Sequence, residues 1–159
     1  MTSEPVPELD LGLAALFAGQ AIADAVRARL VARGFAGLRV SHGFLVQRLL
    51  EDEQSIAALA KALGVTQQAI SKTVSELERL GYVRRRPDPR DGRVRLVALT
   101  DRGRAAVAAA REERAAVEVD LRERLGPRRV DAATRVLREV LDVHGASAAV
   151  RTRRVRPPA

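Results

Sequence analysis

The stretch "SIAALAKALGVTQQAISKTVSELERLG", residues 55–81, decides the fold because it contains the signals for two helices joined by a tight turn. Ser55 can cap the first helix, and Gly64 permits the turn that ends it. Thr66 can cap a second helix, which Gly81 can close. The apolar residues expected on the inward faces are Ile56, Leu59, Leu63, Ile70, Val74, Leu77 and Leu80. Two caps and two closing glycines in so short a stretch predict a helix-turn-helix.

An arginine-rich hairpin follows the two helices. The segments "YVRRR" (82–86) and "RVRLVALT" (93–100) have the pattern of strands, and "PDPRDG" (87–92) between them contains an Asp-Gly turn signal and two stiffening prolines. At the start of the second strand, arginines lie on one face and apolar residues on the other. Toward its end, both faces of the strand are apolar. We therefore expect a two-stranded β-wing that has a solvent-exposed face near its tip and is buried on both faces at its base, the root of the wing.

Helical patterns flank this central unit on both sides. Apolar residues over about 9–34 recur with the spacing of a long helix, and Ser41 can cap a short helix through "HGFLVQRLL". After the hairpin, Thr100 can cap a long charged helix that ends at Gly126, and a last amphipathic helix runs through "RVDAATRVLREVLDVHG". The order of elements predicts a mainly α fold, a winged helix-turn-helix with additional N- and C-terminal helices.

The charge distribution favours a polyanionic partner. The chain carries a formal net charge of +8. Residues 1–53 hold five basic and seven acidic groups, residues 54–100 nine and four, and residues 101–159 fourteen and nine. The positive excess therefore lies in the helix-turn-helix, the wing and the C-terminal part, as in a protein that presents a basic face to nucleic acid.

The composition excludes several classes of function. The chain has no cysteine, which excludes disulfides, thiol nucleophiles and thiolate metal sites, and only two histidines. No nucleophile, base and orienting group form a catalytic set, so we expect no enzyme, cofactor or metal site. There is no run of 18 uncharged apolar residues and no basic region before the N-terminal apolar part, so we expect no membrane span, no secretory signal and a cytoplasmic location.

The second helix of a helix-turn-helix lies in the major groove of DNA, with its N-terminal residues at the base edges. On the helix over 66–80 these residues are Thr66, Gln67, Gln68, Ser71 and Lys72. A glutamine can make a bidentate contact to adenine, and Lys72 can reach a guanine edge or a phosphate. The hydroxyls of Thr66 and Ser71 suit phosphate oxygens, and Ser55 is a further candidate for contact with the DNA backbone.

The wing supplies cationic groups for the DNA backbone and the minor groove. The predicted wing site consists of Arg84, Arg85, Arg86, Asp88, Arg90, Arg93 and Arg95. The first three lie on the first strand of the hairpin and are expected to contact phosphates. The last two lie on the solvent-exposed face of the second strand. Asp88 stands two residues before Arg90 and is expected to hold its guanidinium by a charge-assisted hydrogen bond. An arginine held in this way on a narrow projection suits the minor groove, above all where A·T tracts narrow it.

The run "LAKALGVTQQAISKTVSELERLGYVRRRPDPRDGRVRLVALTDRG", with the wing signature "DPRDGR" leading to "LT" and "G", resembles the MarR family of bacterial winged-helix regulators. The resemblance is strong over residues 55–103, and the flanking helices match in order over about 9–145. It implies a DNA-binding transcriptional regulator, more specifically a repressor, that binds a pseudo-palindromic operator as a homodimer. It also implies that Arg90 enters the minor groove and that Asp88 positions it.

The resemblance also predicts how the chain is divided. We expect a flexible lead-in (1–8), a helical dimerisation region (9–36 and 101–146), a winged helix-turn-helix (37–100) and a disordered basic tail (147–159). Relatives that bind phenolic ligands do so between the dimerisation and DNA-binding parts. His42 falls at that junction, either in an effector pocket or as a capping or core histidine, and the effector itself stays unidentified.

Two alternatives bear on function. Thiol sensing is excluded, because it needs a cysteine near the N-terminal helices. The alternative to a sequence-specific regulator is an architectural, nucleoid-type protein that coats DNA with little choice of sequence. Random duplex would compete with the protein's own promoter in that case.

Overall fold

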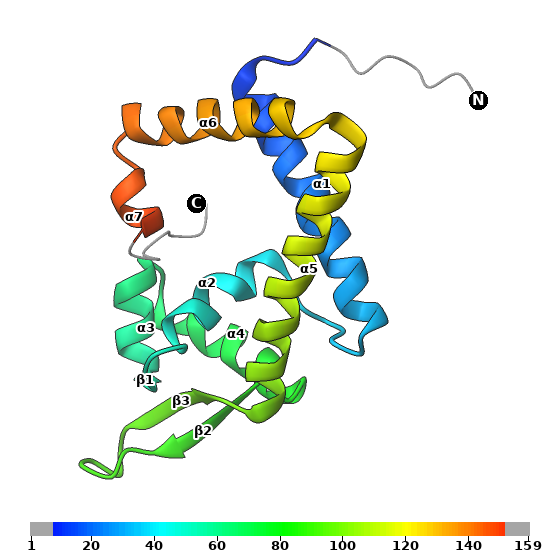
Figure 1. Cartoon of the computed structure of the whole chain (residues 1–159). Helices are drawn as coiled ribbons and strands as arrows, with labels where there is room; N and C mark the ends of the chain where they lie inside the picture. Colours follow the sequence, from blue (N-terminus) through cyan, green and yellow to red (C-terminus); the bar gives the residue numbers. More distant parts are fainter. Residues whose placement is uncertain (1–7, 152–159) are drawn as a thin grey trace.

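The computed structural model describes residues 8–151 of the 159-residue chain. Its elements in order are α1 (Leu11–Ala32), α2 (Val40–Arg48), β1 (Gln54–Ser55), α3 (Ile56–Leu63), α4 (Gln67–Arg79), β2 (Val83–Pro87), β3 (Arg95–Leu99), α5 (Asp101–Leu125), α6 (Pro127–Val143) and α7 (Ser147–Arg151). Figure 1 shows α3, α4 and the strands at the lower end, α6 at the upper end, and α5 running between them. The β2–β3 hairpin projects from the lower end, so the predicted mainly α winged helix-turn-helix with flanking helices is confirmed.

The predicted caps organise the helix-turn-helix. The Oγ of Ser55 accepts a hydrogen bond from the backbone N–H of Ala58 at 3.1 Å, and the Oγ1 of Thr66 accepts one from Ala69 at 3.1 Å. Gly64, between α3 and α4, has a φ of 68°, a left-handed conformation that glycine adopts without the steric cost of a side chain. These local interactions fix where both helices begin and where the first one ends.

Apolar residues of this unit form the main core. Leu59 and Leu63 of α3 are buried in one cluster with Leu77 of α4. The cluster extends through α2, α4 and the root of the wing, with Leu45, Leu49, Ile70, Val74, Tyr82, Val83, Val97 and Leu99. Because the wing root belongs to the core, the hairpin is fixed to the helix-turn-helix instead of hanging from it.

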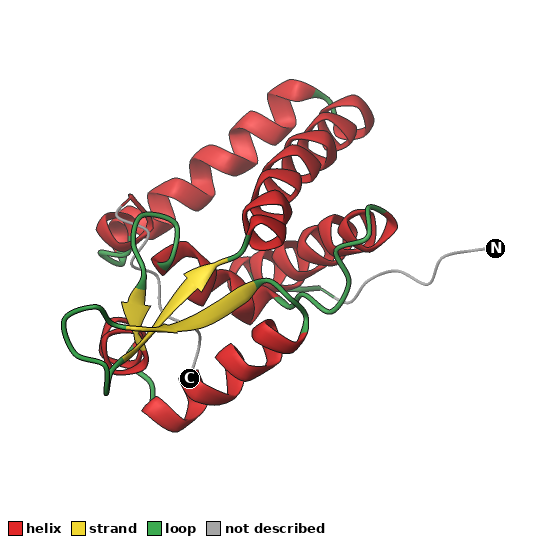
Figure 2. Cartoon of the chain, turned by 90° about the horizontal axis from the view of Figure 1, so that it is seen from below, coloured by secondary structure: helices red, strands yellow, loops and turns green. Residues whose placement is uncertain are grey.

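The sheet has three antiparallel strands in the order β1-β3-β2 (Figure 2). The sequence predicted only two strands, since the two residues of β1, Gln54 and Ser55, are too few to show an alternating pattern. In β3, Arg95 is exposed and residues 97–99 are buried. The predicted solvent-exposed face near the tip and the buried root are therefore confirmed.

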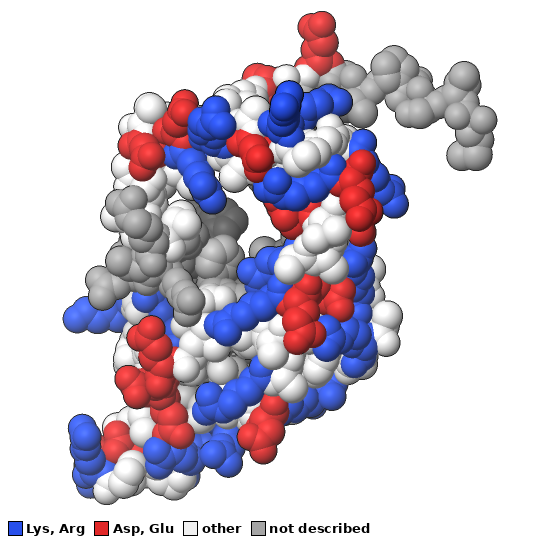
Figure 3. All heavy atoms as spheres, viewed as in Figure 1, with Lys and Arg blue, Asp and Glu red and all other residues white. Residues whose placement is uncertain are grey.

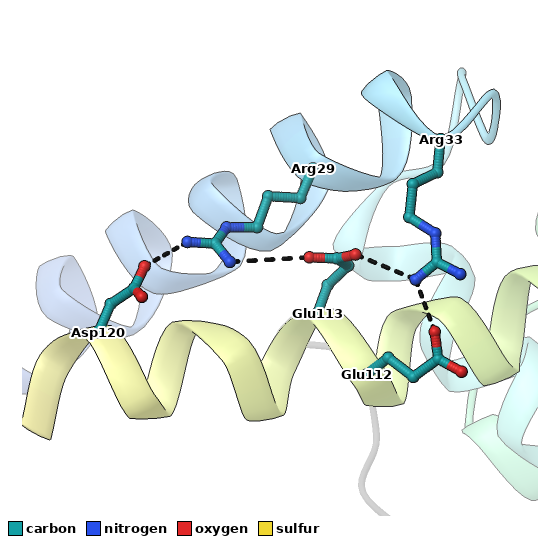
Figure 4. A network of polar contacts seen from close by, with 5 residues as sticks. All are labelled: Arg29, Arg33, Glu112, Glu113 and Asp120. Carbon is teal, nitrogen blue, oxygen red and sulfur yellow. Dashed lines mark hydrogen bonds and ion pairs between the residues drawn. The ribbon is translucent and has the colours of Figure 1, made fainter.

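Helices α1 and α5 lie side by side and are joined by ion pairs (Figure 4). A second apolar cluster between them consists of Val26, Leu30, Ala109 and Val117. Glu113 of α5 lies between Arg29 of α1, at 3.8 Å, and Arg33, the C-cap residue of α1, at 3.0 Å. Arg29 also pairs with Asp120, and Arg33 pairs with Glu112 at 2.7 Å. Since exposed ion pairs contribute little each, the apolar cluster is the main source of stability at this contact.

Helix α1 also carries a long apolar surface. By length and composition alone it could cross a membrane, a property that the sequence analysis did not anticipate and that the core helices of soluble proteins share. Its exposed apolar side chains are Leu11, Leu13, Leu16, Phe17, Ile22 and Val31, with 39–61% of each accessible in the single chain. Only Val26 and Leu30 are buried, against α5. Most of the apolar surface of α1 is therefore left uncovered by the chain itself.

Two local predictions were wrong. Helix α2 begins after Arg39, not at Ser41, because the Nδ1 of His42 accepts the Arg39 backbone N–H at 3.3 Å and performs the capping. Residues 147–151, predicted to be disordered, form the short helix α7, which is too short to show a helical period. The rest of the predicted lead-in and tail, residues 1–7 and 152–159, lies outside the described residues.

Candidate nucleic-acid interface

The predicted reading residues lie at the N-terminal end of α4, on the side away from the core. They are Thr66, Gln67, Gln68, Ser71 and Lys72, of which only Ser71 is partly buried. Within residues 8–151, the side chains of Gln67, Gln68 and Lys72 make no hydrogen bond or ion pair. Two amides and one ammonium group are therefore available to donate and accept at base edges.

The two capping hydroxyls have both a structural and a chemical role. The oxygens of Ser55 and Thr66 accept backbone N–H groups, as described above. Each hydroxyl keeps its proton, which can be donated to a phosphate oxygen. Capping is therefore compatible with the predicted contacts to the DNA backbone.

Two Asx turns fix the backbone of the wing tip. The Oδ1 of Asp88 accepts the backbone N–H of Arg90 at 2.8 Å, and the Oδ1 of Asp91 accepts that of Arg93 at 3.0 Å. Hydrogen bonds from Asp88 N–H to Val94 O and from Val94 N–H to Asp91 O, both 2.9 Å, close the loop. The tip is thus ordered by its own side chains.

One prediction about the tip needs correction. Asp88 holds the backbone of Arg90, and its carboxylate makes no ion pair with the Arg90 guanidinium among the described residues. The reason is distance along the chain, since an aspartate reaches the N–H two residues on through a small ring, whereas the long arginine side chain extends beyond it. The Arg90 side chain is exposed and unpaired within the described residues.

The other wing arginines fall into two groups. Arg85 is bound to Glu78 of α4, with Nη1 2.6 Å from Oε2, and Arg86 is bound to Glu53 in the segment before β1. The hydrogen bond from Glu53 raises the pKa of the Arg86 guanidinium above its ordinary value. Carboxylates of the same chain thus already hold both side chains, and their contacts with phosphates stay a prediction.

The side chains of four wing arginines make no hydrogen bond or ion pair among the described residues. They are Arg84, Arg90, Arg93 and Arg95, all exposed. Figure 3 shows basic side chains at the projecting tip and over the lower end of the molecule, interspersed with acidic ones. The free cations of the wing thus flank the exposed end of α4, which is the arrangement that phosphate and minor-groove contacts require.

His42 is buried beneath this interface, and both capping and core packing describe its role. Its Nε2 lies 3.0 Å from the Arg39 guanidinium and 3.6 Å from the Oε2 of Glu76 on α4. Burial lowers the pKa of His42 below its ordinary value and the Arg39 charge lowers it further, while Glu76 opposes both. The ring is therefore neutral at pH 7 and connects α2 with α4.

His42 also lines a cavity of about 680 Å³ between α1, α2 and α5. The wall is mainly apolar, with side chains such as Ile22, Val26, Leu30 and Phe44. Arg111 and Arg114 lie at the same cavity, so an otherwise apolar space has cationic groups on its wall. Its position between the α1–α5 pair and the helix-turn-helix is the one predicted for an effector pocket.

Comparisons with known proteins agree with this geometry. Residues 40–94 match the sequence profile of the MarR family. A segment of 63 residues, 40% of the chain, is 36% identical to "Uncharacterized HTH-type transcriptional regulator YdgJ" of Bacillus subtilis (strain 168). That segment spans 38% of the curated relative.

Solved structures share the fold over most of the chain. Wild-type apo MarR from E. coli is similar with a TM-score of 0.63 and 22% identity, over 84% of this chain and 98% of that one. The structure described as "Transcriptional repressor, CouR, bound to a 23-mer DNA duplex" is similar with a TM-score of 0.62 and 26% identity, over 87% of this chain and 99% of that one. Residues 40–94 therefore match the MarR family, and most of the chain has the winged helix-turn-helix fold of these solved transcriptional regulators.

Proposed function

We propose that this regulator is a homodimeric, sequence-specific repressor that binds a pseudo-palindromic operator in the cytoplasm, at the nucleoid. The observation that carries the proposal is the free polar end of α4 beside four unpaired arginines of the wing, among the described residues. The MarR family, which residues 40–94 match, is a family of transcriptional regulators. Two relatives of similar fold have been solved with DNA, a mutant of S. aureus MepR with an oligodeoxyribonucleotide and CouR with a 23-mer duplex.

In the proposed complex, α4 lies in the major groove. Gln67 and Gln68 read base edges, with adenine as the partner that a glutamine contacts through two hydrogen bonds. Lys72 reaches a guanine edge or a phosphate, and the hydroxyls of Thr66 and Ser71 donate to phosphates. Ser55 donates to the DNA backbone from the start of α3.

The wing lies along the adjacent minor groove. Arg90 enters that groove, where a narrow A·T tract concentrates negative potential. Arg84, Arg93 and Arg95 contact phosphates, which fix the register of the protein without reading sequence.

A homodimer is supported by apolar surface that the single chain leaves exposed. On α1 this surface includes Leu16 and Phe17, 61% and 52% exposed, and α6 buries none of its residues within the chain. Leu125 and Leu137 continue it at the end of α5 and along α6. Pairing of these helices would place two copies of α4 on successive major grooves, about 34–36 Å apart.

The cavity beside His42 is the proposed effector pocket. A ligand bound between α1, α2 and α5 would change the distance between the two DNA-binding units and so shift the population that fits the operator. The identity of such an effector is not part of the proposal.

Footprinting on the DNA upstream of the coding sequence tests the proposed function. We expect one protected region with two half-sites one helical turn apart, and resistance to a large excess of random duplex at the same salt concentration. Equal competition by random duplex would instead support the architectural alternative, a protein that coats DNA with little sequence choice.

A further inference from the structure

Arg85 of β2 is bound to α4 by four hydrogen bonds. Its Nη1 donates to the Oε2 of Glu78 at 2.6 Å, and its Nη2 donates to the Ser75 hydroxyl at 2.9 Å and to the Ser71 carbonyl at 3.2 Å. Its backbone N–H donates to the other carboxylate oxygen of Glu78 at 3.0 Å. A single strand residue is thus attached to two turns of the helix.

The contact is specific in its geometry. Ser71, Ser75 and Glu78 are spaced so that they form one stripe along α4, and the planar guanidinium of Arg85 meets all three. The backbone N–H of Arg85 belongs to the edge of β2 that faces away from β3, because β2 is the outer strand of the sheet. Glu78 therefore satisfies both the free strand edge and the side chain of the same residue.

We infer that Arg85 and Glu78 form a clamp that sets the position of the wing relative to α4, so that Arg85 is a positioning residue and not a phosphate contact. This inference rests on the proposed function, because it assigns the clamp to DNA binding. Arg90 lies five residues beyond Arg85, past the end of β2 at Pro87 and in the loop at the tip of the wing. A small rotation at the clamp is therefore amplified at the tip, where Arg90 must meet the minor groove while α4 stays in the major groove.

The clamp and the change in net charge predict opposite effects of Glu78→Gln on the affinity for DNA. Removing a carboxylate from a protein that binds a polyanion ordinarily strengthens binding. Glu78→Gln removes a carboxylate but also breaks the charge-assisted hydrogen bonds that hold Arg85. If the clamp positions the wing, this variant binds DNA more weakly than the wild type.

The experiment measures binding of the full-length variants to the footprinted operator at several salt concentrations. The variants are Glu78→Gln, Arg85→Ala, Arg85→Lys and the double variant Glu78→Gln/Arg85→Ala. Glu51→Gln is the matched charge control, since Glu51 is an exposed loop carboxylate that makes no ion pair among the described residues. Arg84→Ala is the reference for loss of a phosphate contact.

We expect each single clamp variant to lose about tenfold in affinity, and the double variant to lose no more than either. Arg85→Lys should behave like Arg85→Ala, because an ammonium keeps the charge but cannot meet three acceptors in one plane. The salt dependence of binding should stay that of the wild type in the clamp variants, whereas Arg84→Ala should lower its slope by about 0.9. Hydroxyl-radical protection should be lost at the flanking minor grooves and kept in the central region, which a general loss of folding would not produce.

Two results would overturn the clamp. One is binding by Glu78→Gln that is as tight as, or tighter than, binding by Glu51→Gln. The other is wild-type affinity for Arg85→Lys together with a slope lowered by about 0.9 for Arg85→Ala, which is the behaviour of a phosphate contact.

Amide hydrogen exchange of the protein without DNA separates the clamp from the proposed function. The clamp predicts faster exchange of the Arg85 amide and of the wing in Glu78→Gln, with global stability measured alongside, and no change in Glu51→Gln. Unchanged exchange of the Arg85 amide would contradict the clamp even if the operator is bound. Failure of the wild type to prefer its operator would contradict the proposed function, and the exchange experiment would still decide the clamp.

Discussion

The arginines of the wing differ in whether an acidic residue of the same chain binds their guanidinium groups. Arg85 and Arg86 are held by Glu78 and Glu53, while four other wing arginines are free among the described residues. The sequence predicted the wing and its arginines, because strand and turn signals are local. It could not predict the Glu53–Arg86 pair, since these residues are 33 positions apart and their contact depends on β1 and β2 pairing with the two sides of β3.

Asp88→Ala tests whether the ordered tip prepares Arg90 for the minor groove. The change removes the acceptor of the Arg90 N–H, so we expect binding to weaken by about 1 kcal/mol. Arg90→Ala should cost more, about 1–3 kcal/mol, and only on operators with A·T flanks. Fluorescence anisotropy with A·T-flanked and G·C-flanked duplexes measures both. Wild-type binding by Asp88→Ala would show that the turn has no part in recognition.

His42 predicts a dependence of stability on pH. Its pKa in the folded protein is lowered, chiefly by burial, so the neutral ring is favoured by folding. The corresponding stability is fully present above the unfolded pKa of about 6.5 and is lost as the pH falls through the lower folded value. Urea unfolding between pH 8 and 5 should therefore show a steeper loss for the wild type than for His42→Gln. Parallel curves would contradict a buried, neutral His42.

At the scale of the element, local signals predicted helix boundaries wherever a side chain near in sequence makes the cap. The hydroxyls of Ser55, Thr66 and Thr100 all cap helices as expected. Ser41 is not the cap because α2 already begins after Arg39, whose backbone N–H donates to the imidazole of His42, an interaction that composition does not indicate. The strand β1 and the helix α7 were missed since elements of two and five residues have no measurable period.

Gly103 in the first turn of α5 shows how closely this helix approaches the wing root. A Cβ at this position would lie 2.1 Å from the Tyr82 carbonyl oxygen, a backbone atom that cannot move aside easily. We expect Gly103→Ala to lower the free energy of unfolding by about 1–3 kcal/mol, as other overpacked sites do. Gly43→Ala is the control, because a Cβ there meets nothing within 4 Å and should be neutral or stabilising in a helix. Denaturant unfolding measures both, and equal stability of the two variants would contradict the close contact.

At the scale of the whole molecule, the most informative surface is the one the chain does not cover. The helix α6 buries no residue within the chain, and most of α1 is exposed although it is strongly apolar. The sequence indicated a long helix with an apolar face, but periodicity alone does not show whether that face packs within the chain or against a second copy. The ion pairs and the small apolar cluster with α5 cover one side of α1. Its other, apolar side is left exposed, where a second copy of the chain can pack.

Phe17→Asp tests the proposed dimer. A charge placed in the apolar surface of α1 should convert the protein to monomers and reduce operator binding by more than tenfold, because both half-sites must be held together. Sedimentation equilibrium gives the mass, and Val40→Asp is the control, since it introduces the same charge at an exposed apolar residue of α2. A dimer that survives Phe17→Asp would place the subunit contact elsewhere.

The central claim is that α4 reads sequence, and selection of binding sites from random duplexes tests it most directly. The wild type and Gln68→Ala are each used to enrich sites over several rounds at fixed salt. We predict a pseudo-palindromic site with half-sites one helical turn apart, and loss of base preference at one symmetric pair of positions in Gln68→Ala with the rest of the site unchanged. Enrichment of no common site, or identical sites for both proteins, would contradict the claim.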